Sequence, residues 1–176
     1  PWNPNVIRAI ALAIRNEKIA DAQLTVRIHP LHYRQIADQL VFTEVLESYE
    51  ILSKEFQDEI HIEYPVILPS KANYMMPESE IARLTEEIAD SDVVVNIFST
   101  LNIECAIFDK PLVNICYDHR VAEYVFRPKA RHSVYSDSKE IHNQRIIDTG
   151  GVHCVYNDAQ LIESINGYLE SPQMDR

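Results

Sequence analysis

Glycine is scarce in this sequence of 176 residues, which contains only Gly150, Gly151 and Gly167. The phosphate-binding P-loop and the G-x-G-x-x-G turn of dinucleotide-binding folds each need several glycines within a short stretch. Neither motif is present, so any phosphate site in this chain must be built without a glycine-rich loop.

Cysteine is also rare, and the three present, Cys105, Cys116 and Cys154, form no C-x-x-C pair. An odd number of cysteines without paired spacing argues against a disulfide framework. All three lie in apolar helix or strand patterns. We therefore expect buried, free thiols in a reducing compartment.

Basic residues are in the minority: 16 Lys and Arg stand against 27 Asp and Glu, for a net charge of −11. An acidic surface repels nucleic-acid backbones and anionic membranes, so we expect neither as a partner. No stretch approaches the roughly 20 apolar residues of a membrane-spanning helix. The first residues show no signal-peptide pattern.

What the sequence has is the length and apolar content of one sizeable domain, with 46% hydrophobic residues. It opens on Pro-Trp-Asn-Pro and runs at once into a helical pattern. We therefore expect residues 1–176 to form a single domain, the carboxyl-terminal part of a longer two-domain protein.

Apolar periodicity predicts helices alternating with strands along the chain. This alternation predicts an α/β layer sandwich with a parallel sheet. Helices are expected at 5–19, 33–56 with a break near 42–43, 78–89, 100–108, 139–148 and 159–169. Strands are expected at 24–29, 60–68, 93–98, 112–117 and 152–156. Pro65 interrupts the second of these strands, which is therefore expected to be short or to lie at an edge. The polar segment 118–138 is expected to be an irregular, functional loop.

Polar residues follow three of the expected strands, and the carboxyl ends of parallel strands are where such sheets bind ligands. Strand 24–29 delivers Arg27 and His29, strand 93–98 delivers Ser99 and Thr100, and strand 112–117 is followed by Asp118. We expect these side chains to converge on one site. Strand 93–98 is expected to be buried on both faces, because it is an unbroken apolar run.

The turn at Ser99 and Thr100 is the centre of this prediction. The start of a helix offers unpaired backbone N–H groups and a partial positive charge, which suit a phosphate; the alternative is a plain helix cap. Glu104, one turn later on a helix expected to be largely buried, could accept hydrogen bonds from sugar hydroxyls. Its alternative is a solvated helix position.

Each of the other candidate site residues also has a second, structural interpretation. His29 could donate to a phosphate or be an ordinary loop or core histidine, and Arg27 could share its site or pair with an acid. Asp118 could meet a sugar hydroxyl or cap its loop. The loop cations could close on a diphosphate or remain solvated: Arg120, Arg127, Lys129, Arg131 and His132. No nucleophile elbow is visible, and the seven histidines lack metal-ligand spacing.

Four segments together resemble the nucleotide-binding, carboxyl-terminal half of GT-B glycosyltransferases, near the bacterial surface-polysaccharide enzymes and the CDP-glycerol glycerophosphotransferase group. The segments are RIHP at 27–30, ADSDVVVNIFSTLNIE at 89–104, FDKP at 108–111, and IHNQRIIDTGGVHCV with the final helix and ESP at 141–172. The resemblance covers about residues 5 to 172.

This resemblance implies a Rossmann-like, three-layer α/β/α domain that binds a nucleotide-sugar or CDP-glycerol-type donor. Ser99 and Thr100 would then hold the diphosphate, Glu104 would meet the ribose hydroxyls, and His29 would face the phosphates. The donor is a substrate, and no cofactor or metal is implied. The missing amino-terminal GT-B domain would bind acceptor, so we expect little turnover from this chain alone, in a cytoplasmic setting or at the inner membrane surface. No catalytic residue is assigned.

Two alternatives use the same type of fold. A sugar-nucleotide epimerase half would also need a second domain. A flavodoxin-like interaction module of the receiver type would need an acidic pair after its first strand, where this chain has Arg27 and His29.

Overall fold

The computed structural model describes residues 4–36, 38–68, 75–118 and 133–174, and it is a mixed α/β structure with short parallel sheets. Chain contacts divide it into two compact units, which we call the N-terminal unit (residues 2–84) and the C-terminal unit (from Thr85 onward). The division falls inside one helix, α3 (Glu78–Asp90). Each unit is described by itself.

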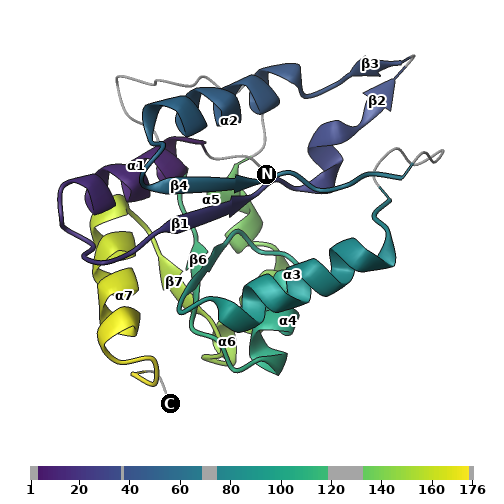
Figure 1. Cartoon of the computed structure of the whole chain (residues 1–176). Coiled ribbons are helices and arrows are strands. Elements are labelled where there is room, and N and C mark those ends of the chain that lie inside the picture. Colours follow the sequence, from purple (N-terminus) through teal and green to yellow (C-terminus); the bar gives the residue numbers. More distant parts are fainter. Residues whose placement is uncertain (1–3, 37, 69–74, 119–132, 175–176) are drawn as a thin grey trace. The chain divides into compact units, whose positions relative to one another are not determined.

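The N-terminal unit packs two helices against a pair of parallel strands (Figure 1). Helix α1 (Pro4–Arg15) and helix α2 (Thr43–Glu55) contact each other, and β1 (Leu24–Arg27) pairs with β4 (Ile60–Glu63). Its buried side chains include Val6, Ile10, Ile28, Leu52, Phe56 and Ile60. The strand expected at 60–68 ends at Glu63, two residues before Pro65, which cannot donate to a ladder.

The expected helix over 33–56 is wrong in its first third. The chain instead forms a 3₁₀ turn, η1 (Pro30–Tyr33), and then a small antiparallel hairpin of β2 (Gln35–Ile36) and β3 (Gln39–Leu40). Asp38 in the hairpin turn has φ of 61°, in the left-handed region that a right-handed helix excludes. The predicted break near 42–43 is where α2 actually begins.

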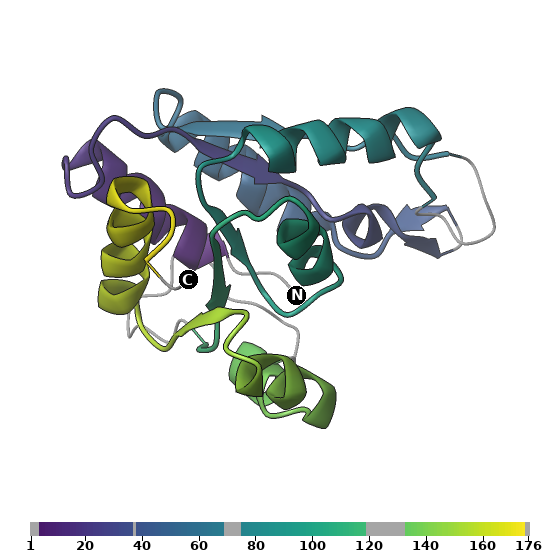
Figure 2. The ribbon, with the colours of Figure 1, turned by 90° about the horizontal axis from the view of Figure 1, so that it is seen from below.

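The C-terminal unit is built on a three-stranded parallel sheet in the order β5–β6–β7. The strands are β5 (Val94–Asn96), β6 (Leu112–Ile115) and β7 (His153–Val155), and the helices are α4 (Leu101–Ile107), α5 (Val134–Ser138), α6 (Ile141–Asp148) and α7 (Asp158–Glu170). Helix α7 packs on β6 and β7, and α4 contacts β5. Figure 2 shows the two helices on different sides of these strands.

The fully buried strand is β6 rather than the predicted 93–98, because β5 is the end strand of this sheet and its residues are only half-buried. All four residues of β6 are buried. The segment expected to be irregular contains helix α5 at its end, while residues 119–132 lie outside the described residues.

Several turns place acidic residues in the left-handed region that usually favours glycine. Glu17, Asp21 and Asp109 have φ of 55°, 50° and 54°, in addition to Asp38. Only Gly150, after α6, supplies a glycine with positive φ, 72°. The scarcity of glycine in the sequence therefore shifts this conformation onto aspartate and glutamate.

Candidate functional site

The turn from β5 into α4 is held by a small network of side-chain hydrogen bonds. The Asn96 amide donates to Ser99 Oγ at 3.0 Å and to Asn102 Oδ1 at 2.7 Å, and the Leu101 backbone N–H donates to Ser99 Oγ at 3.2 Å. Thr100 has helical backbone angles, and its side chain makes no capping hydrogen bond. Both Ser99 and Thr100 are exposed.

Helix α4 differs from the sequence expectation in length and burial. It has seven residues, and the N–H groups of Leu101, Asn102 and Ile103 already donate within the turn. A phosphate here would therefore depend mainly on the two hydroxyls rather than on the helix N-terminus. The prediction that this helix is largely buried is wrong, because Ile103 and Ile107 are 61% and 74% exposed.

Glu104 lies one turn into α4 with its side chain half-buried. Among the residues that the structure describes, its carboxylate forms no hydrogen bond or ion pair. A partly buried carboxylate loses hydration without a compensating protein partner. This geometry leaves Glu104 able to accept hydrogen bonds from a ligand's hydroxyls.

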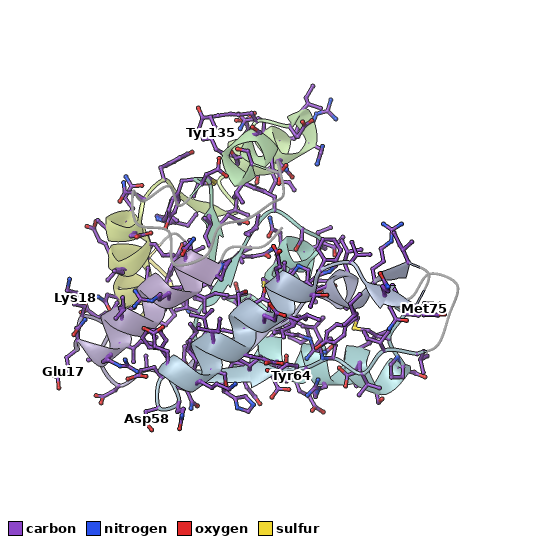
Figure 3. The ribbon with its side chains drawn as sticks, turned by 90° about the horizontal axis from the view of Figure 1, so that it is seen from above. Glu17, Lys18, Asp58, Tyr64, Met75 and Tyr135 are labelled. Carbon is purple, nitrogen blue, oxygen red and sulfur yellow. The ribbon has the colours of Figure 1, made fainter. Side chains whose placement is uncertain are left out.

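Asp118 follows β6 and organises the start of α5. Ser133 Oγ donates to Asp118 Oδ2 at 2.5 Å, and the Val134 backbone N–H donates to Oδ1 at 2.8 Å. Of the two roles left open by the sequence, the structure shows the loop-capping one. Asp118 also lines a shallow depression of about 380 Å³ with Tyr117, Ser133, Tyr135 and Ser136. Tyr135, on α5, is half exposed (Figure 3).

Arg27 and His29 belong to the N-terminal unit, whereas Ser99, Thr100, Glu104 and Asp118 belong to the C-terminal unit. Arg27 Nη2 lies 2.9 Å from Glu80 Oε2, so the acid pairing left open by the sequence is formed. His29 Nδ1 accepts a hydrogen bond from the Leu31 N–H at 3.0 Å and so caps η1. Burial lowers the pKa of His29, which favours the neutral ring. The proposed loop cations at 120–132 lie outside the described residues.

The sequence-based predictions did not single out Asn96 and Asn114 within the strands, or Tyr117 after β6. Asn96 and Asn114 interrupt the apolar runs VVVN and LVNI, and that interruption was the available signal. Tyr117 donates to Asp158 Oδ1 at 2.5 Å, which joins the ends of β6 and β7. Asn157 caps α7, since its Oδ1 accepts a hydrogen bond from the Gln160 N–H.

All three cysteines are free, and Cys105 and Cys116 are buried as expected, while Cys154 is half-buried. Burial raises the pKa of Cys105 to about 11. The interaction between the Cys116 and Cys154 thiols lowers the pKa of Cys154 and raises that of Cys116.

These differences predict selective alkylation. Because the thiolate is the nucleophile, iodoacetamide at neutral pH should modify Cys154 at least about tenfold faster than Cys105 or Cys116. Peptide mass spectrometry over a time course measures the three rates. Equal rates under native conditions would contradict the burial described here, and urea should make the three rates similar.

The parts of the chain that are described contain no cluster of three or more His, Cys, Asp or Glu side chains arranged to hold a metal ion. Within the same residues, no helix has the length and apolar character needed to cross a bilayer. Comparisons with protein-family models, with curated proteins and with solved structures find no match to this chain.

Proposed function

We propose that this chain is the donor-binding part of a transferase that uses a nucleoside diphosphate linked to a sugar or to glycerol. The observation that carries the proposal is the carboxyl edge of the β5–β6–β7 sheet. Ser99 and Thr100 follow β5 there, and Asp118 follows β6. The Glu104 carboxylate, which has no partner among the described residues, lies about one helical turn beyond Ser99. Open parallel sheets bind ligands at this edge.

The layering of the C-terminal unit supports a Rossmann-like domain. Side chains alternate between the two faces of a strand. Asn96 of β5 reaches Asn102 of α4, whereas His153 of β7 lies 2.9 Å from Ser164 Oγ of α7. Because His153 pairs with Val113 while Asn96 pairs with Asn114, these contacts fall on opposite faces of the sheet. One helix on each face is the arrangement of an α/β/α sandwich.

In this proposal the hydroxyls of Ser99 and Thr100 hold the diphosphate, Glu104 accepts hydrogen bonds from the ribose diol, and Asp118 bounds the site on the β6 side. Arg27 and His29 were donor-binding candidates from their strand end and, for His29, from the GT-B resemblance; both have protein partners in the N-terminal unit, and the site proposed here uses neither. A second GT-B domain would bring the acceptor. Transfer would then depend on positioning the donor and stabilising the departing diphosphate.

Glu104→Ala should abolish the thermal stabilisation that a nucleoside diphosphate gives to this chain. Ligand binding to the folded state at ten times its Kd adds about 1.4 kcal/mol of stability. For a chain of this size that is a rise in Tm of about 3–6 °C. The measurement is thermal unfolding with UDP, CDP or GDP at millimolar concentration. Glu163→Ala is the matched control, because Glu163 is an exposed acid on α7.

The proposal fails if none of the three nucleotides raises the Tm of the unmodified chain. It also fails in its assignment of Glu104 if the Glu104→Ala and Glu163→Ala variants show the same rise. Adenosine diphosphate and inorganic pyrophosphate are useful additional ligands, since a rise with pyrophosphate alone would assign binding to the phosphates without the nucleoside.

A further inference from the structure

A shallow depression that opens to solvent lies just past the end of β6, at the carboxyl edge of the β5–β6–β7 sheet. Its volume of about 380 Å³ is within the range of small-molecule sites. It is lined by Tyr117, Asp118, Ser133, Tyr135 and Ser136. We call it the Tyr135 depression. Tyr135 is 50% exposed and Ser136 is also exposed, so a ligand can reach these two residues from solvent.

One part of the lining is held in place by hydrogen bonds within the protein. Tyr117 donates to Asp158 Oδ1 at 2.5 Å. The Asp118 carboxylate accepts from Ser133 Oγ at 2.5 Å and from the Val134 backbone N–H at 2.8 Å. A site whose lining is already ordered loses less conformational entropy when a ligand binds.

The other part of the lining is available to a ligand. Among the described residues, the hydroxyls of Tyr135 and Ser136 form no hydrogen bond. Lys139 Nζ lies 5.2 Å from the centroid of the Tyr135 ring, a cation–π contact that helps to hold the ring. The Tyr135 depression therefore offers a partly exposed aromatic ring beside neutral groups that can donate and accept hydrogen bonds.

These groups suit one part of a nucleoside diphosphate better than the others. A phosphate is disfavoured, because Asp118 brings a negative charge and no lysine or arginine is among the described residues that line the depression. A nucleobase is neutral and planar, stacks on aromatic side chains, and carries hydrogen-bond donors and acceptors on its edge. The proposed function assigns the ribose to Glu104, which leaves the base without a site.

The strand pairing supports a placement of the base here. Ser99 and Asp118 follow β5 and β6, which are neighbouring, parallel strands. Neighbouring strands lie about 4.8 Å apart, so the two residues start from the same edge of the sheet a short distance apart. A nucleotide whose phosphates lie at the Ser99 turn is long enough to extend to the end of the next strand.

We propose that the Tyr135 depression binds the nucleobase of the donor, and this inference rests on the proposed function. The base stacks on the ring of Tyr135, and its edge forms hydrogen bonds with the Ser136 hydroxyl. Tyr135 thereby contributes affinity for any nucleobase, since every base has a face that can stack.

The test is the binding of UDP and CDP to Tyr135→Ala and Tyr135→Phe, measured by isothermal titration calorimetry. Tyr135→Ala should bind both nucleotides at least about tenfold more weakly, because the stacking interaction is lost. Tyr135→Phe keeps the ring and should bind both as the unmodified chain does. Inorganic pyrophosphate has no base, so its affinity should be the same for all three proteins.

Two further variants serve as controls. Tyr64→Ala removes a tyrosine of similar exposure, 49%, from the N-terminal unit and should leave the affinity for UDP and CDP unchanged. Tyr135→Leu keeps an apolar side chain but no aromatic ring, and it should weaken binding as Tyr135→Ala does. Because Tyr135 is half exposed, Tyr135→Ala should change the Tm by less than about 2 °C.

A second measurement observes the Tyr135 ring directly. The chain contains nine tyrosines, and Tyr135→Phe identifies the signal of Tyr135 in an NMR spectrum of the chain labelled with ¹³C in its tyrosine rings. Addition of UDP or CDP should shift this signal, because a stacked base changes the magnetic environment of the ring. Addition of pyrophosphate should leave it in place.

The outcomes separate this inference from the proposed function. If the chain binds neither UDP nor CDP, the proposed function fails and this inference fails with it. If both bind, but Tyr135→Ala and Tyr135→Leu bind them as tightly as the unmodified chain does, only the inference is overturned. If these variants lose affinity for UDP-GlcNAc or CDP-glycerol but not for UDP or CDP, the depression holds the transferred group and the assignment to the nucleobase is wrong. An equal loss of affinity for pyrophosphate would also overturn it.

Discussion

Replacing Glu80 by alanine should destabilise the N-terminal unit by about 3–5 kcal/mol, because it leaves two arginines partly buried without their acid. The Glu80 side chain is 7% exposed and pairs with Arg27 at 2.9 Å and with Arg83 at 2.8 Å. The Arg27 side chain is 15% exposed. Arg83 also pairs with Glu63 at the end of β4. The network therefore ties α3 to both strands of the unit.

The measurement is equilibrium unfolding in urea, with Glu78→Ala as the control in the same turn of α3, where Glu78 is exposed. The control should change the free energy of unfolding by less than about 0.5 kcal/mol. The loss of unfolding free energy for Glu80→Gln should lie between those for Glu80→Ala and Glu78→Ala, since the amide oxygen can still accept a hydrogen bond but carries no charge. A loss below about 1 kcal/mol for Glu80→Ala would show that the network contributes little.

The pH dependence of this network has a definite sign. Burial by itself would raise the pKa of Glu80, but the hydrogen bond and charge of Arg83, with that of Arg27, outweigh it and lower the pKa. A lowered pKa in the folded state means that the stabilisation is present above the unfolded pKa and is lost as pH falls through the folded value. The difference in stability between the unmodified chain and Glu80→Gln should therefore shrink in acid.

Acid should also destabilise the fold through His32, by about 3 kcal/mol between pH 6.5 and pH 4. Burial lowers the pKa of His32 from 6.5 to about 4 in the folded chain. His32 is 4% exposed, its ring lies 5.7 Å from the Phe42 ring and 6.0 Å from the Tyr49 ring, and its Nδ1 has no partner among the described residues. Since the unfolded chain binds the proton more tightly, stability falls as pH drops through this window and levels off below it.

His32→Phe should flatten this part of the pH profile while keeping the aromatic packing. At pH 7.5 the variant should be within about 1 kcal/mol of the unmodified chain, because a neutral ring is replaced by an apolar one. His142→Asn, at an exposed position on α6, is the control and should retain the acid-dependent loss. Parallel profiles for the unmodified chain and His32→Phe would rule out His32 as the origin.

The sequence predicted the α/β class and the positions of most helices and strands, because those depend on local apolar periodicity. The prediction was wrong where the structure depends on more than the spacing of apolar side chains. The hairpin at 35–40 depends on a left-handed Asp38, and the burial of β6 over β5 depends on which strand lies at the end of the sheet. Strand order is set by long-range pairing, which a local pattern does not encode.

In the candidate site, too, local patterns could be predicted from the sequence and long-range contacts could not. Ser99, Thr100 and Asp118 were placed at strand ends by pattern alone, and the structure puts them there. The partner of Arg27 lies 53 residues away on α3, and the pairing of Asn96 with Asn114 depends on register. Neither contact follows from sequence spacing. The role of each residue in donor binding remains a proposal.

The acidic residues in left-handed turns affect the unfolded chain as well as the folded one. A glycine at Glu17, Asp21, Asp38 or Asp109 would adopt the same φ without steric cost, but it would also leave the denatured chain freer to explore other conformations. Residues with a Cβ are strained at these positive φ angles in the folded state. They also lower the conformational entropy of the unfolded chain, so less entropy is lost on folding. These turn residues therefore affect stability partly by restricting the conformations of the unfolded chain.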